Sequence, residues 1–335
     1  MTTRRRGRLG DGKTRAKCPN GRADAMKVAV IGCGLIGSAW AIVFARAGCE
    51  VALFDTVADA VPRAQQVIRD RVDDLERNKL VSDPRAVLAH VTAASSLAAA
   101  LRDADYAQES VFETAEAKRA IFAEIDRQIG SETIVGSSSS GIPASSFTEP
   151  LSCRSRCLIA HPVNPPYLIP VVELVPAPWT APQTVKWVRD FMERIGQKPV
   201  TMSRELEGFI LNRLQGALLT EAWNLVAEGY ASVSDVDRTV ASGLGARWSF
   251  MGPFETIDLN APGGVADYAR RLGPLYSRIA ASQRNPHVWD ENLITEVERQ
   301  RRAILPATQL QKRTAWRDRR LMALAVHKQA LERKE

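Results

Sequence analysis

The sequence predicts an α/β protein in which an N-terminal Rossmann-type, doubly wound sheet is followed by an all-helical C-terminal domain. Up to about residue 203, short β-like runs alternate with segments of helical periodicity. Strands that alternate with helices favour a parallel sheet covered by helices on both faces. Regularly spaced glycines follow the first strand, and beyond residue 203 only the helical period remains.

The spacing of apolar residues gives the expected elements of each half. Strands are predicted at 27–31, 50–54, 90–94, 105–110, 133–138, 157–161, 171–175 and 198–202, with helices near 35–47, 57–80 and 115–129. In the second half, helices are predicted at 207–230, 234–243, 253–259, 262–282 and 314–333. Residues 26–203 should therefore form the nucleotide-binding domain and residues 204–335 a helical substrate and dimerisation domain.

Charge and composition narrow the class of protein. The net charge is +7, but residues 1–25 carry eight basic residues against two acidic ones, so the rest of the chain is nearly neutral. We expect this stretch to be a disordered basic arm, or the product of an upstream start codon. It has no aromatic residues, and no nucleic-acid-binding module accompanies it, so we predict no nucleic-acid partner.

An uncharged run at residues 28–45 follows arginines, as in a signal anchor. The glycines within this run and the acid after the next strand favour a nucleotide-binding unit instead, so no membrane association is predicted. The five cysteines are an odd number without nearby histidines, which favours free thiols in the cytoplasm and no metal site.

The stretch VIGCGLIGSAW has the G-x-G-x-x-G spacing directly after a strand and at the start of a helix. The three glycines would allow a tight turn, a close approach to a pyrophosphate and close helix packing. Asp55 ends the next strand, where a carboxylate accepts hydrogen bonds from ribose hydroxyls and repels a 2′-phosphate, so NAD is the predicted cofactor. The predicted cofactor-binding residues of this region are Gly32, Gly34, Leu35, Ile36, Gly37 and Asp55.

His161 ends a predicted strand, and Glu173 lies in the next one, twelve residues later. A return of the chain through the prolines between them can place the carboxylate beside the imidazole. A carboxylate at Nδ1 fixes the tautomer and makes Nε2 a general base for an alcohol proton. A satisfied histidine in a proline-stiffened loop is the alternative interpretation.

Several motifs occur in a fixed order: the glycine fingerprint, SSSSG at 137–141, HPVNPPY at 161–167, GFILNRL at 208–214 and MGPFETIDL at 251–259. In this order they resemble the L-3-hydroxyacyl-CoA dehydrogenase superfamily, over about residues 26–335. Within it, the motifs are most similar to a branch that oxidises L-gulonate.

The resemblance implies a role for several residues. His161 would be the general base and Glu173 its partner, while Asn164 and Asn212 would position substrate and cofactor. Ser139, within the run of four serines, matches the serine that hydrogen-bonds the reacting oxygen. Glu109 and Lys118 match residues near the nicotinamide ribose.

The expected reaction is the NAD-dependent oxidation of the 3-hydroxyl of a small L-3-hydroxy acid, such as L-gulonate, to the 3-keto acid. Residues 57–80 have balanced charges, which gives little attraction for the phosphates of CoA. Arg213 and Arg247 are candidates for binding the substrate carboxylate. The alternatives are a 3-hydroxybutyryl-CoA dehydrogenase, an enzyme for carnitine-like substrates, and a structural protein that kept only the fold. The apolar surface of the helix at 207–230 favours a homodimer.

Overall fold

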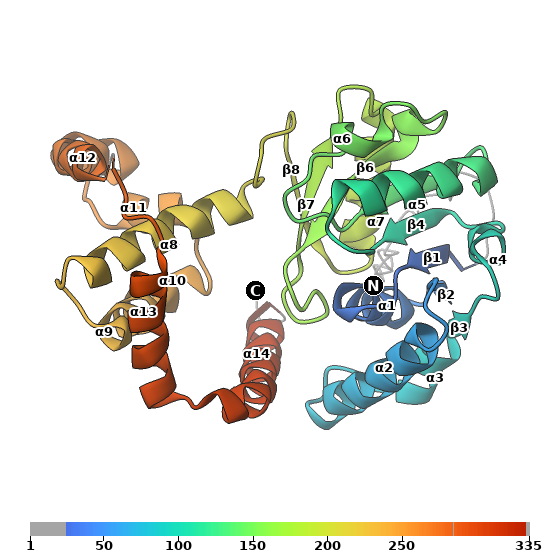
Figure 1. Ribbon diagram of the computed structural model, residues 1–335, viewed down its shortest axis with the longest axis horizontal. Coiled ribbons are helices and arrows are strands. Elements are labelled where there is room, and N and C mark those ends of the chain that lie inside the picture. The colour runs from blue at the N-terminus through green and yellow to red at the C-terminus, as the bar shows by residue number, and fades with distance from the viewer. Residues whose placement is uncertain (1–24, 284, 333–335) are drawn as a thin grey trace, which may run out of the picture. The chain divides into compact units, whose positions relative to one another are not determined.

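The computed structural model describes residues 25–283 and 285–332, which form two compact units (Figure 1). The nucleotide-binding unit contains the residues up to Phe209 and those from Arg320 on, and the helical unit is Ile210–Arg319. Cys18 and all but the last residue of the predicted basic arm lie outside the described residues.

The nucleotide-binding unit is built on one eight-stranded sheet with the order β3-β2-β1-β4-β5-β6-β7-β8. All neighbouring strands are parallel except β6 and β7, which pair antiparallel. The strands are β1 (Lys27–Ile31), β2 (Glu50–Phe54), β3 (Val91–Ala93), β4 (Tyr106–Glu109), β5 (Ile134–Ser137), β6 (Cys157–Pro162), β7 (Val171–Pro176) and β8 (Lys198–Thr201). All eight predicted strands are present.

Each face of this sheet has its own core, because successive side chains of a strand point to opposite faces. In β1, Val28 and Val30 belong to one core, and Ala29 and Ile31 to the other. The first core is covered by α1 (Leu35–Arg46), α2 (Ala60–Arg77), α3 (Pro84–Ala89) and α7 (Pro182–Arg194). The second is covered by α4 (Leu97–Leu101), α5 (Ala115–Gln128) and α6 (Ser145–Thr148).

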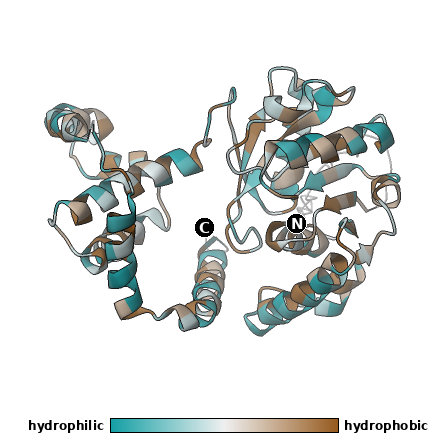
Figure 2. Cartoon of the chain, in the orientation of Figure 1, coloured by the Kyte–Doolittle hydropathy of each residue, from teal (hydrophilic) through white to brown (hydrophobic). Residues whose placement is uncertain are grey.

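Helix α1 is enclosed almost completely, whereas α2 has one apolar face. Nine consecutive residues of α1, 37–45, are buried. The ribbon of α1 is mostly brown in Figure 2, which marks hydrophobic residues, whereas that of α2 alternates brown and teal. The uncharged run at 28–45 is therefore β1 and the buried helix that follows it. No helix within the described ranges is long and apolar enough to span a membrane.

The helical unit contains α8 (Leu211–Ala227), α9 (Val233–Thr239), α10 (Gly245–Trp248), α11 (Pro253–Leu259), α12 (Gly264–Ser282), α13 (Glu291–Ile304) and the first part of α14 (Leu310–Glu332), with a π-helical turn at Val240–Leu244. Trp223 of α8 stacks on Trp289, with 4.5 Å between ring centroids. The backbone N–H of Val233 donates to Gln300 of α13 at 2.9 Å.

The division into units differs from the predicted boundary at residues 203 and 204. Residues 204–209 pack with the sheet, since the Phe209 side chain is fully buried in the second core. The chain also returns to the nucleotide-binding unit at its end, because Met322 of α14 is buried in the first core. The last turns of the final predicted helix thus belong to the unit that contains the sheet.

Candidate active site

His161 and Glu173 form a buried pair on neighbouring strands. Nδ1 of His161 lies 2.8 Å from Oε2 of Glu173, and both side chains are almost completely buried. The two residues are direct partners in the antiparallel register of β6 and β7. The twelve-residue spacing therefore follows from two strands joined by the loop of residues 163–170. The Phe209 ring lies 5.6 Å from the imidazole, between ring centroids, and closes one side of it.

The serine-rich turn after β5 is held by a carboxylate that sequence reasoning missed. Oε1 of Glu113 accepts hydrogen bonds from the Ser139 hydroxyl and the Ser140 N–H, each at 2.7 Å, and from the Gly141 N–H at 3.3 Å. Burial raises the pKa of Glu113, but the hydrogen bonds from Ser139 and Ser140 and the charge of Lys118 outweigh it, so the pKa lies below its usual value. An acid five residues before Lys118 was the available signal in the sequence.

The predicted serine lies inside this turn. Ser139 is fully buried, and its hydroxyl is bonded to the Glu113 carboxylate, the Ile142 carbonyl at 2.8 Å and the Ile142 N–H at 3.0 Å. The next residue, Ser140, is exposed. The turn therefore uses Ser139 as an internal link and presents Ser140 at its surface.

Glu109 and Lys118 are brought together, but below the surface. Nζ of Lys118 lies 3.1 Å from Oε1 of Glu109 and 3.1 Å from Oε2 of Glu113, and Glu109 also accepts from the Ser137 hydroxyl at 2.5 Å. Burial raises the pKa of Glu109, and the Lys118 ammonium and the Ser137 hydroxyl act in the opposite direction. Glu109 is 0% exposed, so its carboxylate lies below the surface of this network. Glu113, at the edge of this network, is the exposed acid.

The glycine turn has the shape that a dinucleotide requires. Gly32 has a φ of +93°, and a Cβ there would lie 2.6 Å from the Ser110 backbone. A Cβ on Gly37 would lie 1.9 Å from the Gly32 carbonyl oxygen, whereas one on Gly34 would meet no protein atom within 4 Å. No side chain caps the first turn of α1, so its N–H groups can bind phosphate oxygens.

Asp55 holds this turn from the end of β2. Its carboxylate accepts from the Cys33 N–H at 2.7 Å and from the Val57 N–H at 2.9 Å, and it is only partly buried. Leu35 is 69% exposed and Ile36 half-buried beside the open Gly34. Burial raises the pKa of the Cys33 thiol to about 12, so it stays protonated within the turn. Glycines, free N–H groups and carboxylate together suit a pyrophosphate and an unphosphorylated ribose.

The two predicted asparagines lie in different places. Asn164 is exposed in the loop between β6 and β7, three residues after His161. Asn212 is half-buried in the first turn of α8, in the helical unit. The candidate arginines, Arg213 and Arg247, are exposed in the same unit. Among the residues that the structure covers, no group of His, Cys, Asp and Glu side chains is arranged to hold a metal ion.

Residues 27–206 match the family model of the 3-hydroxyacyl-CoA dehydrogenase NAD binding domain, and residues 208–303 match that of the 3-hydroxyacyl-CoA dehydrogenase C-terminal domain. The chain belongs to the 3-hydroxyacyl-CoA dehydrogenase family. NAD is therefore its cofactor, and it is an NAD-dependent oxidoreductase that acts on CH–OH groups. These findings confirm the resemblance and the enzyme class expected from the sequence.

The proteins that this chain resembles carry different names. The chain is 40% identical over 309 residues to a lambda-crystallin homolog of Bos taurus, covering 91% of this chain and 96% of that protein. It is 36% identical over 269 residues to an L-carnitine dehydrogenase of Streptomyces coelicolor, covering 79% and 84%. A solved structure of 5-formyl-3-hydroxy-2-methylpyridine 4-carboxylic acid 5-dehydrogenase has a TM-score of 0.76 and 27% identity, covering 92% of this chain and 99% of that chain.

Proposed function

We propose that the protein oxidises the 3-hydroxyl of a small L-3-hydroxy acid to a 3-keto acid, with L-gulonate as the substrate of choice. The buried hydrogen bond of 2.8 Å between His161 and Glu173 carries this proposal. A base with a carboxylate behind it is what removal of a proton from a secondary alcohol requires. When bound, NAD+ supplies the acceptor for the hydride from C3.

The proton is moved by the imidazole. Because Nδ1 is held by the Glu173 carboxylate, Nε2 is the ring nitrogen that accepts the hydroxyl proton. The imidazolium that forms is stabilised by the same carboxylate. Glu173 is thus a positioning residue, since it acts on the reaction through His161.

The remaining roles in the proposal concern the substrate oxygen. We assign the hydrogen bond to that oxygen to Ser140, because the Ser139 hydroxyl is buried and already bonded to Glu113 and Ile142. Asn164 and Asn212 are proposed to position substrate and cofactor. Glu113 replaces Glu109 in the proposal as the acid that faces the nicotinamide ribose.

The charges of α2 support a small substrate over a CoA ester. Arg63 is paired with Asp59, and Arg71 and Arg77 both lie close to Asp74, at 3.3 and 2.8 Å. Three of the four arginines of this helix are therefore paired with carboxylates of the same segment, while Arg69 is bonded to Gln66. Such a surface offers little attraction to the phosphates of CoA. The alternative substrate is 3-hydroxybutyryl-CoA, in keeping with the 3-hydroxyacyl-CoA dehydrogenase name of the family.

The test is NADH formation by the purified protein with L-gulonate, L-carnitine and L-3-hydroxybutyryl-CoA in parallel. We expect turnover of L-gulonate, and a kcat about 10²- to 10⁴-fold lower in His161→Gln, because the general base is lost. Glu173→Gln should also lower kcat, since the imidazolium loses the carboxylate that positions and stabilises it.

The outcomes separate the parts of the proposal. NAD+ affinity should be the same in wild type and both variants, which controls for misfolding. Oxidation of the CoA ester alone would overturn the substrate assignment and leave the chemistry of the pair intact. Full activity of His161→Gln would show that another group accepts the proton.

A further inference from the structure

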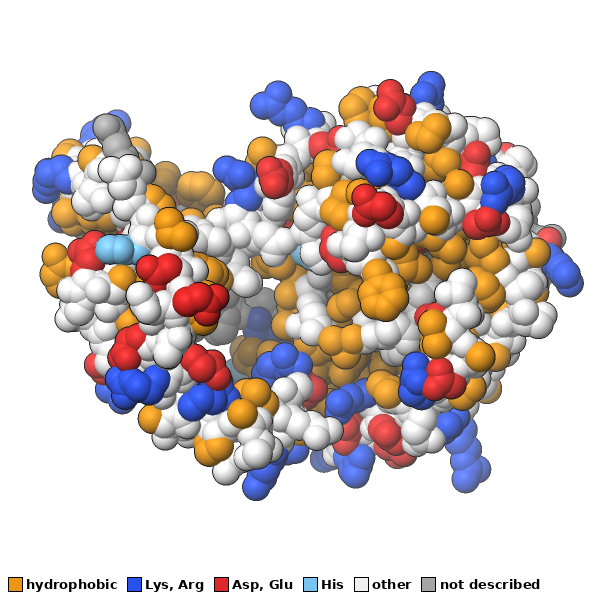
Figure 3. Space-filling view, viewed as in Figure 1, with side chains coloured by type: hydrophobic (Ala, Val, Ile, Leu, Met, Phe, Trp, Pro, Cys, Tyr) orange, Lys and Arg blue, Asp and Glu red, His pale blue; other side chains and the backbone are white. Residues whose placement is uncertain are grey.

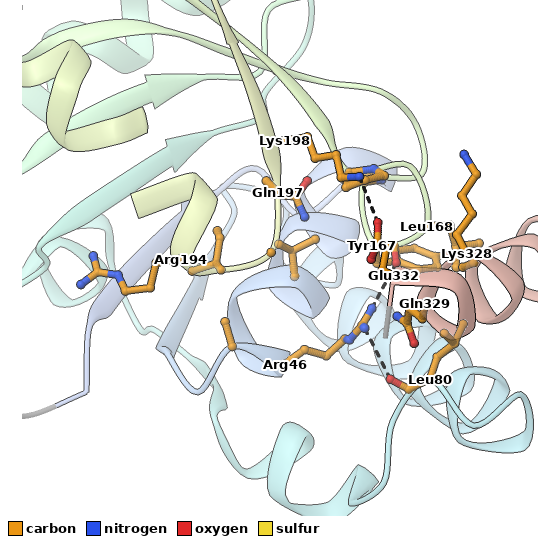
Figure 4. A pocket seen from close by; sticks show the side chains of 17 residues that line it. Arg46, Leu80, Tyr167, Leu168, Arg194, Gln197, Lys198, Lys328, Gln329 and Glu332 are labelled. Carbon is orange, nitrogen blue, oxygen red and sulfur yellow. Dashed lines mark hydrogen bonds and ion pairs between the residues drawn. The ribbon is translucent and has the colours of Figure 1, made fainter. Parts of the chain in front are cut away.

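A cavity of about 450 Å³ lies in the nucleotide-binding unit, away from the glycine turn and from His161. Its walls come from the end of α1, the loop between β6 and β7, the α7–β8 connection and the last turns of α14 (Figure 4). This volume is that of a small-molecule pocket. Four cationic side chains line it, Arg46, Arg194, Lys198 and Lys328, against a single carboxylate, that of Glu332.

Arg46 is the innermost cation of this cavity. Its guanidinium donates to the Tyr167 carbonyl at 3.1 Å and the Leu80 carbonyl at 3.4 Å, and no ion pair joins it to a carboxylate in the described part of the chain. Burial lowers the pKa of Arg46. A guanidinium has five N–H donors, so two carbonyls leave capacity for an anion. A half-buried cation without a carboxylate is a costly arrangement that an anionic ligand would relieve.

Gln197 adds a second, independent signal. Its side chain is 8% exposed and lines the cavity, and Oε1 has no hydrogen-bond partner among the residues described. A buried acceptor left without a donor costs about 1–3 kcal/mol. Because a carboxylate or phosphate oxygen cannot donate to it, a hydroxyl group of a ligand is the fitting partner.

The rim of the cavity holds further positive charge. Lys198 lies 3.3 Å from Glu332, which pairs those two charges. Lys328 lines the same wall one turn earlier on α14 and forms no ion pair within residues 25–283 and 285–332. After this pairing, the cavity retains an excess of positive charge that suits a dianion better than a monoanion.

We propose that this cavity is a second ligand site, separate from the catalytic one, that binds a small hydroxylated phosphate monoester. The phosphate contacts Arg46 and Lys328, and a hydroxyl of the same molecule donates to Oε1 of Gln197. Since Arg46 belongs to α1 and Lys328 to α14, the ligand links two helices of the nucleotide-binding unit. The inference does not depend on the substrate proposed above.

The experiment is thermal unfolding and calorimetric titration of the full chain with sn-glycerol 3-phosphate, in the presence of saturating NAD+ so that the glycine turn is occupied. Inorganic phosphate and glycerol, at equal ionic strength, serve as comparison ligands. We expect saturable binding of the ester that raises the unfolding temperature, because a ligand that binds only the folded state stabilises it. Inorganic phosphate should bind more weakly, and glycerol should not bind.

Three variants locate the site. Lys328→Ala and Arg46→Met should each lower the affinity for the ester at least about tenfold. This is the effect expected for the loss of a charge-assisted hydrogen bond. Gln197→Leu should remove the preference for the ester over inorganic phosphate without lowering the unfolding temperature, because it deletes an unpaired acceptor. Lys186→Ala, an exposed lysine of α7 outside the cavity, is the matched control and should bind as wild type.

Several outcomes would overturn the proposal. These are no binding of the ester, equal affinity for ester and inorganic phosphate, or binding that survives unchanged in Lys328→Ala and Gln197→Leu. If Arg46→Met does not fold, the other two variants decide the result, since Lys328 lies at the rim and leucine suits a buried position.

Discussion

Glu113 shows how a single carboxylate organises the serine-rich turn after β5. It binds the Ser139 hydroxyl, two backbone N–H groups and the Lys118 ammonium at the same time. Charge-assisted hydrogen bonds of this kind are stronger than neutral ones. The position of Ser140 therefore depends on Glu113, although the two residues are far apart in the sequence.

Replacement of Glu113 by Gln should affect both activity and acid stability. The turn would be held less firmly, so we expect kcat/KM to fall by on the order of 10- to 100-fold, the size of effect expected when a reacting group is misplaced. The pKa of Glu113 is lowered from 4.5 in the folded state. Its carboxyl therefore takes up a proton at higher pH in the unfolded state, and the stability it provides is lost as the pH falls below about 4.5.

Denaturant unfolding measured from neutral pH to below this value checks the second effect. Wild type should lose stability more steeply with falling pH than Glu113→Gln, while Glu116→Gln, an exposed acid of the same region, should behave as wild type. Parallel curves for wild type and Glu113→Gln would mean that this carboxyl does not titrate differently on folding.

Individual site residues could be predicted from the sequence where their spacing along the chain places them together. The His161 and Glu173 pair was predictable because two adjacent strands bring a strand end and its partner together. Four serines in a row cannot be told apart in this way, since the distinction between Ser139 and Ser140 lies in which one turns inward. Glu113 lies in a loop, where no periodicity reveals what a side chain binds.

Among the elements, the turn between β1 and α1 depends on two glycines for different reasons. Gly37 allows α1 to approach the Gly32 carbonyl, where a Cβ would lie at 1.9 Å, so its role is packing. Gly34 has no protein atom near the position of a Cβ, so we expect its role to be in the binding of the NAD+ pyrophosphate. Substitution of each glycine by alanine, which adds one methyl group, can therefore distinguish the two roles.

We expect Gly37→Ala to destabilise the protein by at least about 1–3 kcal/mol, the usual cost of overpacking. Gly34→Ala should leave stability unchanged within about 0.5 kcal/mol, as for a surface substitution. Gly34→Ala should instead lower the affinity for NAD+ about tenfold or more, because the methyl group occupies the space that the pyrophosphate needs. Unfolding curves with NAD+ titrations check both, and wild-type NAD+ affinity in Gly34→Ala would contradict the second expectation.

The strands were predictable because buried parallel strands form short apolar runs between helices. The prediction omitted α7, although Val188, Phe191 and Met192 of this helix are buried at helical spacing. The strands at 171–175 and 198–202 were predicted without the crossover helix that two parallel neighbouring strands need. Helix α13 was also omitted, although Leu293, Val297 and Ile304 recur at helical spacing in its sequence.

At the scale of the whole molecule, the helical unit leaves most of its large apolar side chains exposed. Of the described residues in this unit, Val233 is the one large apolar side chain that is buried. Apolar side chains lie on its visible surface in Figure 3, and the exposed ones include Leu214 of α8, Phe250, Phe254, Leu259 and Val288. An apolar surface of this extent marks an interaction site.

We therefore expect a homodimer formed through the helical unit. Light scattering after size exclusion should give twice the chain mass of 36.8 kDa. Leu214→Lys, which places a charge on the 62% exposed leucine of α8, should shift the protein toward the monomer, whereas Arg63→Ala on α2 should not. A monomeric wild type at micromolar concentration would contradict the expectation.

The antiparallel register of β6 and β7 has a consequence for how the enzyme can diversify. His161 and Glu173 are fixed opposite each other by strand pairing, independently of the eight residues that join the two strands. Insertions or substitutions in that connection should leave this pairing intact, whereas a one-residue slip within either strand would turn its side chain to the other face. In the function proposed above, the base and its carboxylate therefore belong to the two strands, whereas Asn164, which is proposed to position the substrate, belongs to the connection that can vary.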